Sequence, residues 1–170
     1  MRNRIGVVVL ATLASTTLLS ACGSIRTDGP LVLSDEETRV CAPVPQFADA
    51  ALGINLADDL PDGIVFNSIE PVGASGVALG GVYVMPAADR LRLLLDAFPP
   101  TGQTPNSWRR AVPAIDAELP TDGAYDMVLR VTTGAGGGHL DGVRVNYSFN
   151  GDQYQTISHL GLTLSTEPCT

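Results

Sequence analysis

LPTDGAYDMVLRV, residues 119–131, decides the fold class of this 170-residue chain. From its middle onward, large apolar residues recur at every second position. The apolar set is Tyr125, Met127, Leu129 and Val131, and the positions between them are Asp126, Val128 and Arg130. Because successive side chains of a β-strand point to opposite faces, this period of two predicts a strand with one face buried.

The strongest turn signal is Asn150-Gly151, which separates residues 143–149 (VRVNYSF) from residues 152–164 (DQYQTISHLGLTL). Asn-Gly between two alternating runs predicts a two-residue β-hairpin turn. The turn fixes the register, which pairs Tyr147 with Tyr154, Val145 with Thr156 and Val143 with Ser158. One face of the hairpin is then apolar and continues to Leu160, Leu162 and Leu164, whereas His159 falls on the polar face.

Four strands are expected earlier in the chain, at residues 39–45, 50–56, 64–72 and 77–85. The prolines of the first predict an edge strand. The turn sequence DDLPDG between the second and third predicts that these two pair with each other.

Two details of this region are also predicted. Gly80-Gly81 predicts a bulge or bend within residues 77–85. Residues 87–98 favour a strand or an extended loop. A short helix is the alternative, because Leu91, Leu94, Leu95 and Phe98 would share one helical face.

These runs predict an all-β domain, an antiparallel β-sandwich of about seven to nine strands. The Leu119-Pro120 turn that leads into Tyr125 resembles the tyrosine corner of immunoglobulin-like and fibronectin-like sandwiches. The whole chain looks like small secreted or lipid-anchored bacterial proteins with an immunoglobulin-like sandwich. The resemblance implies a fold but no reaction, because such sandwiches host binding, adhesion and scaffold roles alike.

The N-terminal segment has the parts of a secretory signal: two arginines, an uncharged apolar run and small residues before Cys22. Its end, Leu19-Ser20-Ala21-Cys22, resembles the lipobox of bacterial lipoproteins. That resemblance implies that Cys22 receives a diacylglyceryl group and becomes the mature N-terminus. The alternative is a transmembrane anchor, but the run is shorter than the ~20 residues that span a bilayer.

This organisation predicts a signal peptide at residues 1–21, a lipidated tether at 22–37 and a β-sandwich domain at 38–170. The domain is expected to be extracytoplasmic and attached to the cell membrane by its lipid. Without residues 1–21, eight arginines and 18 acidic residues give a net charge of −10. Nucleic acid is not an expected partner, because phosphate binding needs clustered cations.

Cys41 and Cys169 are the cysteines that lipidation leaves over. Because an exported protein meets an oxidising compartment, the two are expected to form a disulfide. The alternative is a metal pair, but the chain has no CxxC motif and its two histidines have no nearby ligands. Only four residues separate Leu164 from Cys169, so the first strand should lie near the end of the last one.

Residues 134–142 (GAGGGHLDG) lack the lysine of a phosphate-binding loop and predict a flexible connection with an exposed His139. Residues 73–76 (GASG) lack the pattern of a serine-hydrolase nucleophile elbow. Trp108, Arg109 and Arg110 form a candidate ligand or partner surface, since an aromatic face attracts cations. In the alternative interpretation, Trp108 plugs one end of the β core and the arginines are solvated.

These observations predict a lipid-anchored module with a non-enzymatic binding, accessory or scaffold role in the cell envelope. Its expected partners are the membrane, through the N-terminal lipid, and an envelope protein. No catalytic residue, metal or cofactor is expected. The alternative is an envelope-associated hydrolase.

Overall fold

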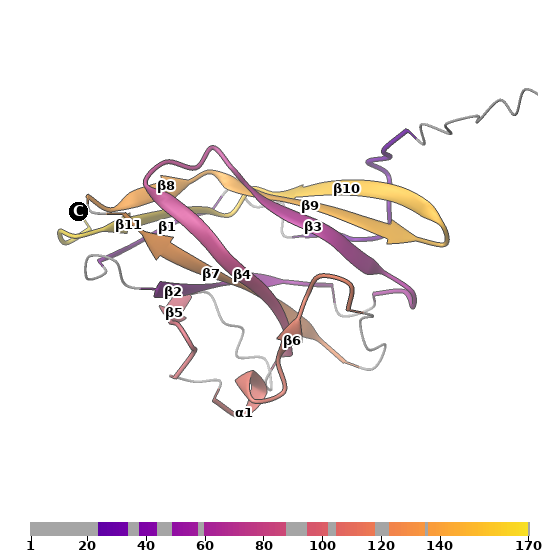
Figure 1. The fold of residues 1–170 in the computed structure, drawn as a ribbon, viewed down its shortest axis with the longest axis horizontal. Helices are drawn as coiled ribbons and strands as arrows, with labels where there is room; N and C mark the ends of the chain where they lie inside the picture. The colour runs from indigo at the N-terminus through magenta and orange to yellow at the C-terminus, as the bar shows by residue number, and fades with distance from the viewer. Residues whose placement is uncertain are drawn as a thin grey trace, which may run out of the picture.

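The computed structural model describes residues 24–33, 38–43, 49–57, 60–87, 95–101, 105–117, 123–134 and 136–169. More than half of these residues lie in strands and only one short helix occurs among them, so the protein is all-β as predicted (Figure 1). The elements are β1 (Arg39–Pro43), β2 (Asp49–Asn55), β3 (Val65–Val72), β4 (Val77–Pro86), β5 (Leu95–Ala97), α1 (Pro105–Trp108), β6 (Val112–Pro113), β7 (Tyr125–Thr133), β8 (Gly138–Leu140), β9 (Gly142–Phe149), β10 (Asp152–Ser158) and β11 (Gly161–Ser165).

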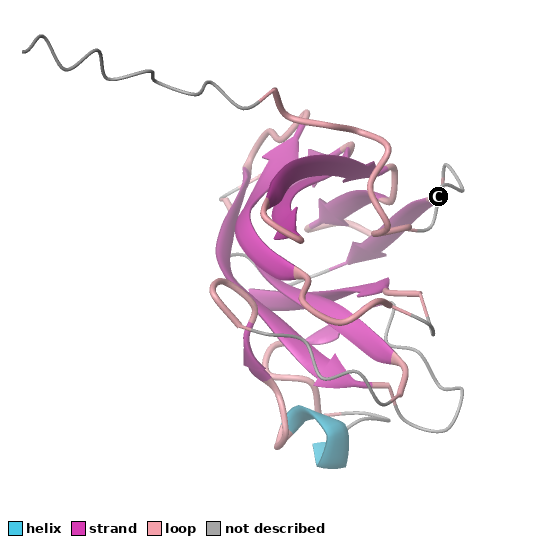
Figure 2. Cartoon of the chain, turned by 90° about the vertical axis from the view of Figure 1, so that its right-hand side faces the viewer, coloured by secondary structure: helices cyan, strands magenta, loops and turns pink. Residues whose placement is uncertain are grey.

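The strands form three sheets, with the orders β5-β2-β7-β4-β6, β10-β9-β3 and β1-β11-β8. Neighbouring strands are antiparallel except for β1 and β11, which are parallel. In Figure 1, β2, β5, β6 and β7 lie below β8, β9, β10 and β11, and Figure 2 shows the same layers from the side. One cluster of buried side chains, contributed by all three sheets, fills the space between these layers.

The central strand β7 is buried on both faces, so the prediction of a half-buried strand is wrong. Met127, Leu129 and Val131 face the main core, as expected. Val128 points the other way and is also fully buried, in a second cluster with Ala51 and Met85. Aromatic residues that follow β5 and end α1 cover this outer face. The alternation shows only which side chains share a face of the strand. Whether that face is buried depends on residues far away in the sequence that pack against it.

The β9–β10 hairpin is confirmed in the predicted register, including Tyr147 opposite Tyr154. Asn150 and Gly151 have φ angles of 52° and 86°. Positive φ at both positions is the conformation of a type I′ turn, which Asn-Gly favours. A local sequence signal therefore fixed the pairing of these two strands.

The predicted pairing of residues 50–56 with residues 64–72 is wrong. β2 pairs with β5 and β7, whereas β3 pairs with β9 in another sheet. The two strands that flank this turn sequence therefore lie in different sheets. The predicted bulge in β4 is confirmed, because its register against β7 shifts between Leu79 and Gly81.

Two further segments differ in detail from the sequence predictions. The glycine-rich residues 134–142 are not simply a flexible connection, because they include β8, which pairs with β11. Of residues 87–98, only Ala87 and residues 95–98 are described, and three of these form β5. Leu119 and Pro120 of the suggested tyrosine corner lie outside the described residues.

Residues 26–33, which the sequence assigned to a free tether, are part of the folded domain. We call this segment the strap. Leu31 and Leu33 are buried in the main core, and Leu33 forms a β-bridge with Leu56. The alternation of Leu31 and Leu33 with exposed Val32 explains why this short apolar stretch can line the core. Cys22 and residues 34–37 lie outside the described residues.

Cys41 and Cys169 form a disulfide, the pairing that the sequence predicted, with their Cα atoms 6.0 Å apart. Cys41 lies on β1 opposite Thr163 of β11. The first strand therefore lies beside the last one, as the short reach from Leu164 to Cys169 required. The bridge links residues 128 positions apart in sequence.

Candidate binding groove

Two neighbouring cavities, of about 460 Å³ and 340 Å³, open on the surface of the β1-β11-β8 sheet. Arg39 and Asp141 line both cavities. The larger also contains the side chains of Ser75, His139 and Thr163, and the smaller contains Thr38 and His159. We call the two cavities together the Arg39 groove.

Strand pairing explains how residues so distant in sequence meet in the Arg39 groove. Thr163 of β11 lies opposite His139 of β8. His139 in turn exchanges two backbone hydrogen bonds with Ser75, each 2.8 Å long. Arg39 lies on the other side of β11, opposite Gly161. The sheet therefore sets these polar side chains side by side on one surface.

Glycines allow the loop before β4 to lie against β8. A Cβ atom at Gly138 would lie only 2.6 Å from the carbonyl oxygen of Ser75. Gly76 has a φ angle of 68°, which side chains rarely adopt. The glycine richness of residues 134–142 thus has a structural reason, the close approach of two backbones beneath the groove.

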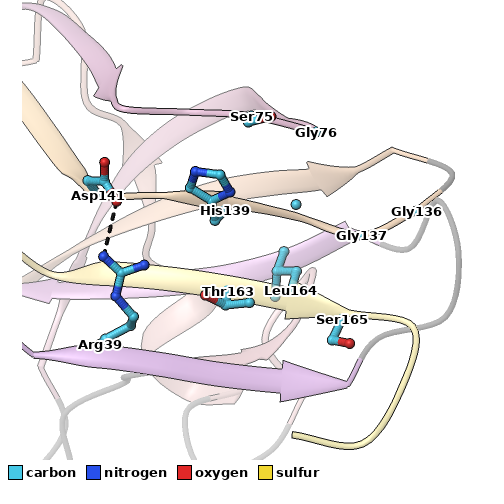
Figure 3. A pocket seen from close by; sticks show the side chains of 11 residues that line it. Arg39, Ser75, Gly76, Gly136, Gly137, His139, Asp141, Thr163, Leu164 and Ser165 are labelled. Atoms are coloured by element: carbon cyan, nitrogen blue, oxygen red, sulfur yellow. Dashed lines mark hydrogen bonds and ion pairs between the residues drawn. The ribbon is translucent and has the colours of Figure 1, made fainter.

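Among the described residues, Arg39 and Asp141 form the only ion pair within the groove, with 3.1 Å between Nη2 and Oδ1 (Figure 3). Both side chains are more than half exposed. Such a pair adds little to stability because water screens it. Its donors and acceptors therefore stay accessible to a polar ligand.

His139 and His159 are both exposed, as their positions in the sequence predicted. They line different cavities on the two sides of the Arg39–Asp141 pair. No pattern in the sequence predicted that either histidine lies near Arg39 or Ser75. Arg39 and Asp141 are 102 positions apart, and no local motif marks their contact.

Trp108 lies elsewhere, at the end of α1. Figure 1 shows this helix at the bottom, whereas β8 and β11 lie at the upper left. Its ring makes edge-to-face contacts with Tyr83 and Phe98, with centroids 5.1 and 5.2 Å away. Trp108 therefore closes the second buried cluster, which is the packing that the alternative interpretation predicted. Arg109 is exposed and donates a hydrogen bond to Asn106, and Arg110 is also exposed.

A metal centre has no support in the described part of the chain, where no three His, Cys, Asp or Glu side chains are grouped to hold an ion. Nor does any helix among these residues have the length and apolar composition to cross a membrane.

No protein-family model matches the chain, and no curated protein matches it significantly.

Proposed function

We propose that the protein is a lipid-anchored extracytoplasmic module that binds a polar ligand or an envelope protein partner in the Arg39 groove. The proposed location outside the cytoplasm depends on the lipobox that ends at Cys22. The Cys41–Cys169 disulfide supports export, because such bonds persist in oxidising compartments.

The observation that carries the binding role is the composition of the Arg39 groove. A guanidinium, a carboxylate, two imidazoles and hydroxyl groups line one open surface. Together these groups can donate hydrogen bonds to a polar ligand and accept hydrogen bonds from it. Because the groove is open and crosses three strands, it suits an extended ligand better than an enclosed small molecule.

We also propose that the layers form an immunoglobulin-like sandwich. The support is the main buried cluster, which joins the five-stranded sheet to the two smaller ones. The parallel pairing of β1 with β11, which puts the first strand at the edge beside the last, supports this topology as well.

A hydrolase is the second candidate, because Ser75, His139 and Asp141 line the same cavity. In a serine hydrolase the imidazole takes the proton of the serine hydroxyl, and the carboxylate orients that imidazole. Here the carboxylate of Asp141 accepts a hydrogen bond from Arg39. The hydrogen bonds between Ser75 and His139 join their backbones, not their side chains. This arrangement favours binding over catalysis.

The anchor predicts that Cys22→Ser abolishes acylation, because the thiol is the acceptor. The two acyl chains of a diacylglyceryl group are needed for stable attachment, since a single chain binds only marginally. Mass spectrometry of the protein from a membrane fraction should show the diacylglyceryl mass in the wild type alone. A Cys22→Ser protein that still carries this mass would contradict the lipoprotein proposal.

If the ligand or partner binds in the Arg39 groove, Arg39 should be needed for binding. A photoreactive amino acid at Thr163 should cross-link the ligand or partner in cells, and Arg39→Ala should reduce the adduct several-fold. Arg144→Ala is the matched control, because Arg144 also forms an ion pair, with the exposed Glu70, but lines neither cavity of the groove. Equal adducts in the two variants would exclude the Arg39 groove as the binding surface.

A further inference from the structure

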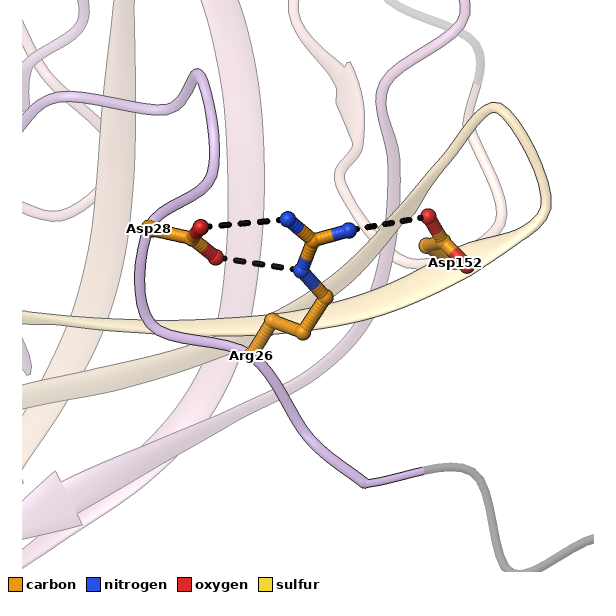
Figure 4. Close-up of polar contacts among 3 residues, drawn as sticks. All are labelled: Arg26, Asp28 and Asp152. Carbon is orange, nitrogen blue, oxygen red and sulfur yellow. Dashed lines mark hydrogen bonds and ion pairs between the residues drawn. The ribbon is translucent and has the colours of Figure 1, made fainter.

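The strap is held to the start of β10 by both backbone and side-chain contacts. The amide of Arg26 donates to the carbonyl of Gln153 (3.0 Å), and the amide of Gln155 donates to the carbonyl of Arg26 (2.8 Å). The guanidinium of Arg26 bridges Asp28 and Asp152 at 3.1 and 3.3 Å (Figure 4). It also lies over the Tyr154 ring, 5.3 Å from the centroid.

A second set of contacts fixes the other half of the strap. The amide of Leu31 donates to the hydroxyl of Tyr147 (3.1 Å), a buried hydrogen bond. Leu31 and Leu33 then insert into the main core. The strap is therefore attached at both ends, and residues 26–33 do not act as a free linker.

The strap fixes where the chain leaves the domain. Arg26 pairs in parallel with Tyr154, so Ser24 and Ile25 run toward the Asn150-Gly151 turn at the start of β10. Only Gly23, Ser24 and Ile25 separate Cys22 from Arg26. Four residue steps span at most about 14 Å, whereas a free tether from Cys22 to Thr38 would span at most about 58 Å.

The Arg39 groove lies at the other end of the same strands. Asp141 immediately precedes β9 and His159 immediately follows β10, whereas the Asn150-Gly151 turn joins the opposite ends of these two strands. Figure 1 shows the indigo strap on the right, at the same end of β9 and β10 as this turn, and β8 and β11 on the left. β9 has eight residues, so its two ends are about 24 Å apart.

We propose that the strap seats the Asn150-Gly151 end of the domain on the lipid headgroups and presents the Arg39 groove away from the bilayer. This inference rests on the proposed lipid anchor at Cys22. The side chain of Ile25 is 59 % exposed and lies three positions from that anchor. An exposed aliphatic side chain so close to the lipid can bury itself at the headgroup boundary, as those of interfacial segments do.

Two fluorescent labels test the orientation. Asp62 and Ala74 are both exposed and lie in the turns at the two ends of β3. Val65 pairs with Ser148 near the Asn150-Gly151 turn, and Val72 pairs with Gly142 near the groove. Acylated full-length protein, labelled through Asp62→Cys or Ala74→Cys, is bound to phosphatidylcholine vesicles that carry a headgroup quencher. We expect several-fold stronger quenching of the label at position 62.

Two insertions test the role of the strap itself. A Gly/Ser spacer of about twelve residues between Gly23 and Ser24 should remove most of the difference between the labels, because the domain then turns freely. The same spacer between Ser34 and Asp35 is the matched control. It should leave the difference unchanged, since the strap lies between it and the membrane.

The outcomes separate this inference from the lipid anchor on which it rests. An acylated protein whose two labels are quenched equally, or in which both insertions have the same effect, would overturn the inference alone. A protein without an acyl group at Cys22 in its mass spectrum would overturn the anchor and the inference together.

Discussion

Removing the disulfide with Cys41→Ala and Cys169→Ala is expected to lower the free energy of unfolding by about 4 kcal/mol. The bridge joins residues 128 positions apart, so it restricts a large loop of the unfolded chain. A loss of this size is comparable to the whole stability of many domains. Urea unfolding without reductant, followed by the fluorescence of Trp108, measures it.

The reduced wild type is the control for this experiment, because it loses the bridge without any substitution. It should unfold at the same urea concentration as the double variant. Two freely reactive thiols in the unreduced wild type would show that the bridge does not form. A double variant as stable as the oxidised wild type would show that β1 is held to β11 without it.

The disulfide also bears on the Arg39 groove. β1 is an edge strand whose side chains are exposed or only half-buried, and β11 is its one partner in the sheet. Arg39 lies at the start of this strand, two positions from Cys41. We therefore expect the double variant to lose the Thr163 adduct along with its stability.

The features that the sequence predicted well are those in which a local signal is enough. The register of β9 and β10 follows from Asn150-Gly151, since a two-residue turn leaves one way to pair the flanking strands. The disulfide follows from the two cysteines that remain once Cys22 is set aside as the proposed lipid acceptor. The bulge in β4 follows from two adjacent glycines that weaken a regular ladder.

The features that the sequence missed depend on long-range packing. The pairing of β2 with β7 joins residues such as Leu52 and Leu129, and no turn between them announces it. The Arg39 groove is assembled from three separate segments around β11 for the same reason. The strap did carry a signal, the short apolar run Leu31-Val32-Leu33. That signal was too short to distinguish a buried segment from a linker.

Polar pairing across β2 and β7 illustrates how such long-range contacts are secured. Asp49 accepts hydrogen bonds from Arg130, one of them 2.8 Å long, and from the hydroxyl of Thr132. The Thr132 bond and then Arg130 hold the pKa of the Asp49 carboxyl below its usual value. Arg130 also lies over the Phe98 ring, which links this pair to the second buried cluster. Nothing in the sequence near Asp49 indicates these partners.

Gly29→Ala is expected to displace the strap and to lower the free energy of unfolding by about 3 kcal/mol, the upper end for an overpacked site. A Cβ atom at Gly29 would lie 2.5 Å from Cδ1 and 2.8 Å from Cγ of Tyr154, and it would also collide with the Tyr147 hydroxyl. These rings cannot move aside easily, because they are buried and stacked on each other with centroids 5.4 Å apart.

Gly136→Ala is the matched control, since a Cβ atom there meets nothing within 4 Å and the residue has no positive φ. Urea unfolding of the two variants should separate them clearly, and hydrogen exchange should show faster exchange of the Leu31 amide in Gly29→Ala alone. Because a displaced strap lengthens the tether, acylated Gly29→Ala should also lose the quenching difference between the labels at positions 62 and 74. Equal stability and equal Leu31 exchange in the two variants would mean that Gly29 does not lie against the tyrosines and that the strap is not docked on β10.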